Sequence, residues 1–121
     1  MTEQSPSGTS AASGVQASLH TIAEILRDPR PLSQEVRVVL AELVDELGRV
    51  LGTAAVPPAE VAHLAESTAR LARAVHRRES PGLLAAARDR VEAAILAAES
   101  KSPLTAGLAR RLLDTLANIG I

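Results

Sequence analysis

The stretch SQEVRVVLAELVDELGRVL, residues 33–51, carries large apolar residues at alternating spacings of four and three. These residues are Val36, Leu40, Leu43, Leu47 and Val50, with Val39, Val44 and Leu51 widening the same stripe. The spacing places one face of an α-helix against a core. Ser33 is a suitable N-cap, Glu35 suits the first turn, and Gly52 is expected to end the helix. The stretch therefore predicts an amphipathic helix that needs neighbouring helices.

The residues before this stretch predict a shorter helix behind a flexible tail. Val15, Leu19, Ile22 and Leu26 follow a helical period, and Asp28-Pro29 ends it because a residue before proline avoids the α region. Residues 1–14 are rich in Ser, Thr, Gly and Ala and are expected to form a disordered tail. They do not resemble a secretory signal. We therefore expect one helical domain over residues 15–121.

Three further helices are predicted after residue 55, each with a proline near its start. Within residues 56–79, Pro58 suits the first turn of a helix whose apolar stripe is Val61, Leu64, Thr68, Leu71 and Val75. Ser80-Pro81 and Ser102-Pro103 each pair an N-cap with a proline in the first turn. Gly120 is placed to end the last helix in the left-handed conformation, with Ile121 contacting Leu116. The prediction is an all-α, small, mostly antiparallel bundle of four to five helices with a core of Leu, Val and Ala.

Composition excludes several classes of chemistry. The 121 residues contain no cysteine and no aromatic residue, which leaves no thiol nucleophile, no thiolate metal site and no ring for base stacking. The chain has 13 Lys and Arg and 14 Asp and Glu, and its net charge of -1 gives no general attraction to nucleic acid or to a membrane. No apolar run is long enough to span a bilayer. We expect a cytoplasmic protein with no membrane partner, and its Arg, Ala and Leu bias is typical of a GC-rich bacterial genome.

The end of the chain resembles a known family. The run from Ser102-Pro103 to Leu113-Asp114-Thr115-Leu116-Ala117-Asn118-Ile119-Gly120-Ile121 is similar to the C-terminal signature of the small bacterial helical proteins catalogued as domain of unknown function 4404. Leu19-His20, the proline-containing break and the acidic helix at residues 33–51 are similar as well. The family usually has a histidine where this chain has Ser102, and residues 56–79 look like an additional helix. The resemblance implies a helical fold and no catalytic residues.

No pattern of catalytic or metal-ligating residues stands out. Glu60 and His63 have the Glu-x-x-His spacing of di-iron bundles, but a complete site needs two such motifs and two further glutamates, so we expect no metal and no cofactor. His20 is spaced to pair with Glu24, and His76 is favoured by the dipole near its helix end. The serines at positions 13, 33, 80 and 102 lie at expected helix starts and are interpreted as caps. An enzyme is not predicted.

Arginines form a basic patch on the third predicted helix. Arg70, Arg73 and Arg77 share a 60° arc opposite the apolar stripe, and Arg78 extends it. Glu66 lies in the same arc, spaced to pair with Arg70. The patch is interpreted as a solvated face, or as one that meets the acids Glu42, Asp45 and Glu46; a nucleic-acid accessory role is the alternative function.

The fourth predicted helix has an apolar arc of roughly 200°. Such width predicts either the central helix of the bundle or a helix whose alanine side, Ala86, Ala93 and Ala97, packs on another chain. Arg90 lies within the arc and must be paired or reach solvent, which marks an edge or an interhelical salt bridge. The predicted function is a non-catalytic protein–protein interaction or self-associating module, of coiled-coil-like helices, whose partner is another protein or a second copy.

Overall fold

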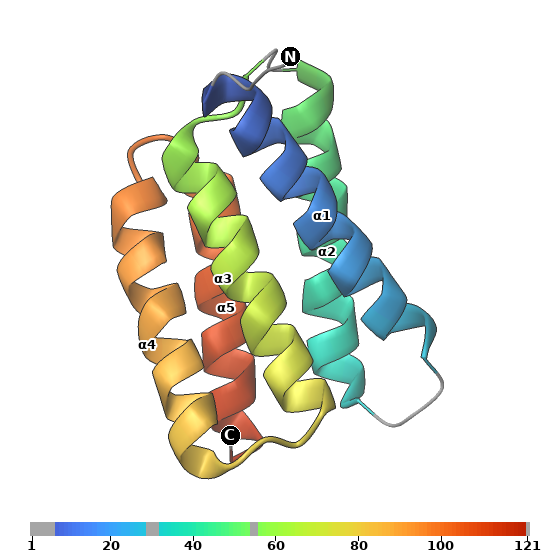
Figure 1. The fold of residues 1–121 in the computed structure, drawn as a ribbon. Coiled ribbons are helices and arrows are strands. Elements are labelled where there is room, and N and C mark those ends of the chain that lie inside the picture. The colour runs from blue at the N-terminus through green and yellow to red at the C-terminus, as the bar shows by residue number, and fades with distance from the viewer. Residues whose placement is uncertain (1–6, 29–31, 54–55, 121) are drawn as a thin grey trace, which may run out of the picture.

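The computed structural model describes residues 7–28, 32–53 and 56–120, and in these residues the only regular elements are helices. They are α1 (Ser7–Arg27), α2 (Gln34–Thr53), α3 (Ala59–His76), α4 (Pro81–Ala98) and α5 (Pro103–Asn118). Figure 1 shows them packed side by side as a bundle. The predicted all-α fold is confirmed.

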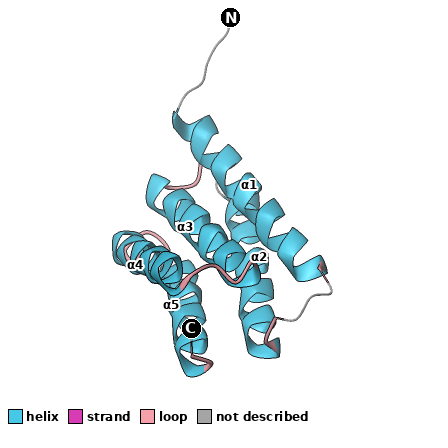
Figure 2. Ribbon diagram, turned by 60° about the horizontal axis from the view of Figure 1, so that its bottom comes forward, coloured by secondary structure: helices cyan, strands magenta, loops and turns pink. Residues whose placement is uncertain are grey.

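Most neighbouring helices run antiparallel. Consecutive helices reverse direction, whereas α1 and α3 lie side by side in the same direction (Figure 1). Figure 2 views the bundle from an oblique angle, with α4 and α5 at one side and α1 and α2 at the other. α3 packs mainly against α1 and α4 and also touches α5, while α2 packs against α1 and α5.

The first helix is longer than the sequence predicted. It begins at Ser7 instead of Val15, so residues 7–14, expected to belong to the tail, are helical; residues 1–6 lie outside the described part of the chain. Val15 and Ile22 are fully buried, as the stripe predicted. A guanidinium N–H of Arg37 donates to the carbonyl of Leu26 at 2.6 Å, which ties the end of α1 to the start of α2.

The segment that looked like an additional helix is the centre of the fold. Nine residues of α3 are buried, and at 100° per residue they cover about 220° of its circumference. Six of the nine are Ala, Ser or Thr, which permit close approach of neighbouring helices. They are Ala65, Ser67, Thr68, Ala69, Ala72 and Ala74. The prediction that α4 is the central helix is wrong, because α4 packs mainly against α3 and α5 at the edge of the bundle.

The large core side chains come from all five helices. Leu40 and Leu43 of α2, Leu64 and Leu71 of α3, and Leu112 and Leu116 of α5 are at most 1% exposed. Ile22 of α1 and Ile95 of α4 join them in the same cluster. The hydrophobic core therefore consists of leucine, isoleucine, valine and alanine side chains, with no aromatic residue.

The ends of α3 and α5 are each followed by a residue in the left-handed backbone conformation. Gly120 has φ of +87° and donates its N–H to the carbonyl of Ala117, as expected of a glycine that follows a helix; its predicted Ile121–Leu116 contact involves a residue outside the described part. Arg78 has φ of +56° after α3. The N–H groups of Arg78 and Glu79 donate to the carbonyls of Val75 and Ala74, which completes a Schellman motif with an arginine at the usual glycine position.

Candidate interaction surfaces

The outward face of α4 is apolar and uncovered. Val91, Ala94, Ile95 and Ala98 point into the bundle and are buried. On the opposite side Ala86, Ala93 and Ala97 are exposed. Leu83 and Leu96, at 58% and 69% exposure, flank this alanine row. The alanine side is thus turned away from the bundle, as the predicted contact with another chain requires; that contact itself stays a prediction.

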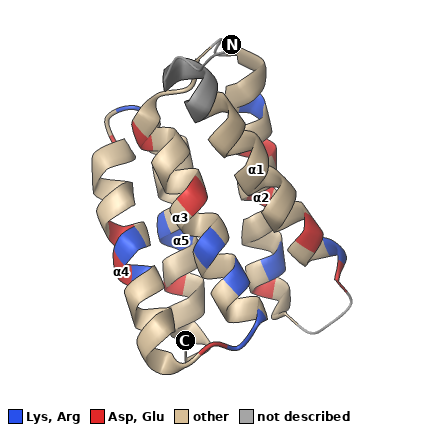
Figure 3. Ribbon diagram, viewed as in Figure 1, with Lys and Arg blue, Asp and Glu red and all other residues tan. Residues whose placement is uncertain are grey.

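Arg90 lies beside the alanine row at the edge of the bundle. It is exposed, and among the described residues no carboxylate lies within ion-pair distance of it. Asp89, its chain neighbour, is exposed and also forms no ion pair within that part of the chain. Figure 3 shows acidic and basic segments next to each other in the middle of α4. The sequence predicted an edge or an interhelical salt bridge for Arg90, and the structure places it at an edge. Asp89 was not predicted as part of this surface, although its helical position puts it on the other side of the alanine row from Arg90.

The basic patch lies along the second half of α3 (Figure 3). Arg70 pairs with Glu66 at 3.3 Å, as predicted, and Arg73 donates to the hydroxyl of Thr21 on α1 at 3.4 Å. Arg77 is exposed on the same side, whereas Arg78 lies in the turn after the helix. The patch does not meet the acids of α2.

Those acids have other partners or none. Glu42 pairs with Arg111 of α5 at 2.6 Å, and Glu46 pairs with Arg49 of its own helix. Asp45 is exposed. Of the two interpretations of the basic patch, the solvated face is the one that the structure has, because Arg70, Arg73 and Arg77 are exposed. The contact with the acids of α2 is wrong, because α3 packs against α1, α4 and α5.

An open groove lies on each side of α3. The larger, of about 550 Å³, lies between α1 and α3 and is lined by small residues of both helices together with His63, Arg70 and Arg73. The smaller, of about 250 Å³, lies between α3 and α4 and brings Arg90 to the same groove as Arg70 and Arg73. Three guanidinium groups from two helices thus line one groove, which the helical periodicity of either segment alone could not predict.

The histidines occupy three different environments. His63 is exposed, and its motif partner Glu60 is half-buried on the same helix. In the described part of the chain no group of three or more His, Cys, Asp and Glu side chains could hold a metal ion. His20 pairs with Glu24 at 3.3 Å on the surface, as the spacing predicted. The His76 side chain is only 9% exposed and lies 3.4 Å from Asp28, the residue that follows α1, so it is no surface cap.

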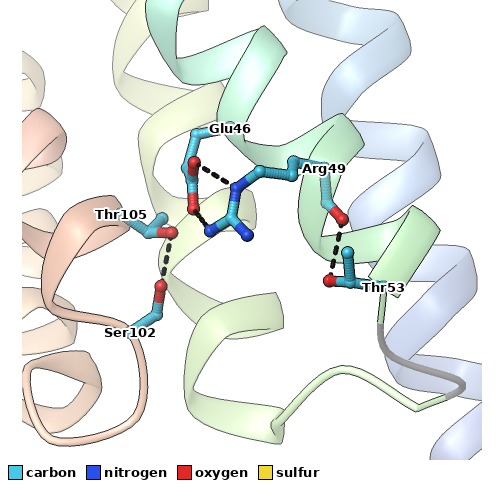
Figure 4. Close-up of polar contacts among 5 residues, drawn as sticks. All are labelled: Glu46, Arg49, Thr53, Ser102 and Thr105. Carbon is cyan, nitrogen blue, oxygen red and sulfur yellow. Dashed lines mark hydrogen bonds and ion pairs between the residues drawn. The ribbon is translucent and has the colours of Figure 1, made fainter.

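Glu46 is the most buried acid of the described residues, at 6% exposure. Its carboxylate accepts two hydrogen bonds from Arg49, one turn away, as Figure 4 shows opposite the start of α5. The hydrogen bonds and the negative charge of Glu46 raise the pKa of Arg49. The pair lies within α2, so it compensates the charge of a buried carboxylate and joins no two helices.

Three of the four predicted cap serines, Ser33, Ser80 and Ser102, lie directly before a helix, and the hydroxyls of two of them accept a backbone hydrogen bond. The hydroxyls of Ser33 and Ser80 accept hydrogen bonds at 3.4 Å from the N–H groups of Val36 and Leu83, as predicted. The hydroxyl of Ser102 instead bonds the hydroxyl of Thr105 at 2.7 Å, at the start of α5 (Figure 4). Ser13 lies within α1, which begins six residues before it, so it is not a cap.

Comparison with known proteins gives no information on function, so the evidence for function is the set of surfaces described above. No protein-family model, no curated protein and no solved structure matches the chain. Within the described helices, none combines the length and the apolar character that crossing a membrane requires.

Proposed function

We propose that this chain is a non-catalytic, cytoplasmic helical module that associates with a second copy of itself through the outward face of α4. The observation that carries the proposal is the exposure of Ala86, Ala93 and Ala97 together with Leu83 and Leu96 on one side of a single helix. An isolated exposed leucine is ordinary, but several exposed Ala and Leu side chains gathered on one side of a helix mark an interaction surface.

The α4 face suits another helix. Alanine side chains allow two helix axes to approach to about 8 Å, the lower end of the usual range. A two-fold dimer needs only one self-complementary patch, so a second copy is the simplest partner. The non-catalytic part of the proposal is supported by the pairing of His20, His76 and Glu46 with nearby charged groups. The resemblance to domain of unknown function 4404 agrees with a helical module and adds no activity.

Analytical ultracentrifugation of matched variants tests this proposal. Ala93→Glu places a charge in the middle of the face, whereas Ala85→Glu places the same charge on an exposed position about 90° away on the same helix. We expect the wild type and Ala85→Glu to self-associate and Ala93→Glu to sediment as a folded monomer with unchanged helicity by circular dichroism. Equal self-association of all three proteins would contradict the proposal.

The alternative function is an accessory role in phosphate or nucleic-acid binding. The observation in its favour is that Arg90 joins Arg70 and Arg73 in the groove between α3 and α4. Against it stand the pairing of Arg70 with Glu66 and the absence of aromatic residues for stacking. Binding measurements with the arginine variants described in the Discussion separate the two functions.

A further inference from the structure

We propose that the two copies pair through α4 helices that lie parallel and in register, so that Arg90 of each copy forms an ion pair with Asp89 of the other. This inference rests on the self-association proposed above and adds the orientation and the charges that select it. It starts from the exposed face of α4, where the leucines and the alanine row lack a covering element among the described residues.

The charges of this face are arranged symmetrically about its centre. Ala86 and Ala93 are seven residues apart, two turns, and define one line along the helix. At 100° per residue Asp89 lies about 50° to one side of that line and Arg90 about 50° to the other, and the rise per residue places them at nearly the same height. Both side chains are exposed, and neither has an ion-pair partner in the described chain.

This arrangement distinguishes the two orientations of a helix pair. A two-fold axis parallel to α4 brings the Arg90 side of one helix against the Asp89 side of the other, which makes two reciprocal ion pairs. An antiparallel pair with Ala86 facing Ala93 of the second copy brings Arg90 beside Arg90 and Asp89 beside Asp89. Opposite charges across an interface fix its register and like charges oppose it, so the parallel pair is favoured.

The surroundings of Arg90 strengthen the preference for a carboxylate partner. Arg90 lines the groove between α3 and α4 together with Arg70, Arg73 and one acid, Glu79, so arginines outnumber carboxylates in the lining of this groove. An acid supplied from outside the chain relieves this repulsion, and Asp89 of a second copy meets it at the right height. Leu83 and Leu96 lie at the two margins of the same face and cover the alanine contact.

The size of the face predicts the strength of the contact. An 18-residue helix is about 27 Å long, so one helix face buries less than a standard interface of roughly 800 Å² per partner. We therefore expect a dissociation constant in the micromolar range.

Cysteine cross-linking tests the orientation cleanly because the chain contains no cysteine of its own. In a parallel pair Ala93 faces Ala93 and Ala86 faces Ala86, so Ala93→Cys and Ala86→Cys each form a disulfide-linked dimer under mild oxidation. Ala85→Cys, exposed but off the contact line, is the matched control and is expected to stay monomeric. Preferential formation of the mixed disulfide when the Ala86→Cys and Ala93→Cys proteins are combined would overturn the parallel arrangement.

A charge exchange tests the ion pairs. Arg90→Asp and Asp89→Arg each place like charges on both sides of the contact, and each is expected to weaken dimerisation about tenfold, the loss of two exposed pairs. The double variant Asp89→Arg/Arg90→Asp restores opposite charges and is expected to dimerise within about threefold of the wild type. Unchanged dimerisation of both single variants would overturn the ion pairs while leaving self-association intact. A wild type that stays monomeric at high micromolar concentration would instead overturn the proposed function itself.

Discussion

Nε2 of His76 lies 3.4 Å from a carboxylate oxygen of Asp28 and joins the C-terminal end of α3 to the C-terminal end of α1. The two helices run parallel, so their ends meet at the same end of the bundle (Figure 1). The imidazole is nearly buried, at 9% exposure, and Asp28 is 26% exposed. Glu24, Arg73 and Arg77 line the small pocket around the pair. The contact fastens α1, which forms one side of the bundle, to its central helix.

We predict that His76→Ala lowers the free energy of unfolding by about 1–3 kcal/mol, because it removes a buried ring and its contact with Asp28. His20→Ala is the matched control, since His20 also pairs with a carboxylate but is 69% exposed; its effect should stay within about 0.5 kcal/mol. Urea unfolding followed by far-ultraviolet circular dichroism measures both. Equal losses for the two variants would show that burial of His76 contributes nothing.

A second prediction concerns the turn between α3 and α4. Arg78 occupies a left-handed conformation that costs most residues about 1 kcal/mol and costs glycine almost nothing. Arg78→Gly is therefore expected to raise the free energy of unfolding by up to about 1 kcal/mol, less the greater chain entropy of glycine. Arg78→Ala removes the same charge while keeping the strained backbone, and it should not stabilise. If the two variants behave alike, the backbone conformation is not the cause.

A third prediction compares two Arg–Glu pairs that differ in the burial of the acid. Arg49→Ala leaves the buried Glu46 carboxylate without its partner and should lower the urea midpoint clearly. Arg111→Ala breaks the pair with Glu42, whose side chains are 53% and 44% exposed, and should have little effect. A midpoint that falls equally in both variants would contradict the structural role of Glu46.

A fourth prediction concerns nucleic acid. A chain of net charge -1 with one short arginine stripe can neutralise only a few phosphates, so binding of DNA or RNA should be weak and should disappear with salt. Fluorescence anisotropy with labelled oligonucleotides at about 0.15 M salt measures this. Submicromolar binding that Arg73→Glu/Arg77→Glu abolishes would favour the alternative function.

The helices could be predicted from the sequence because large apolar residues mark them. Val36 to Val50, Val61 to Val75 and the prolines at positions 58, 81 and 103 predicted four helices to within a few residues of their ends. The start of α1 was missed because the Ser, Thr, Gly and Ala residues before Val15 carry no apolar period, although they form about two further turns of helix.

The central helix could not be predicted because alanine gives little information. The wide apolar arc of α4 consists largely of alanines. Because an alanine side chain has little apolar area, leaving it exposed to water costs little, and a wide alanine arc fits an edge helix as well as a central one. In α3 the buried side also contains Ser67 and four alanines, none of which belongs to the predicted stripe. The approach of Arg90 to Arg70 and Arg73, and that of His76 to Asp28, depends on how the helices pack and has no local sequence signal.

Sedimentation equilibrium of the wild-type chain from low to high micromolar concentration tests the central claim most directly. If α4 pairs with α4 of a second copy, the weight-average molar mass rises with concentration toward twice the chain mass, and Ala93→Glu holds it at the chain mass throughout. A wild-type mass that equals one chain over the whole range would contradict self-association, and an Ala93→Glu chain that dimerises like the wild type would contradict the α4 face as the contact.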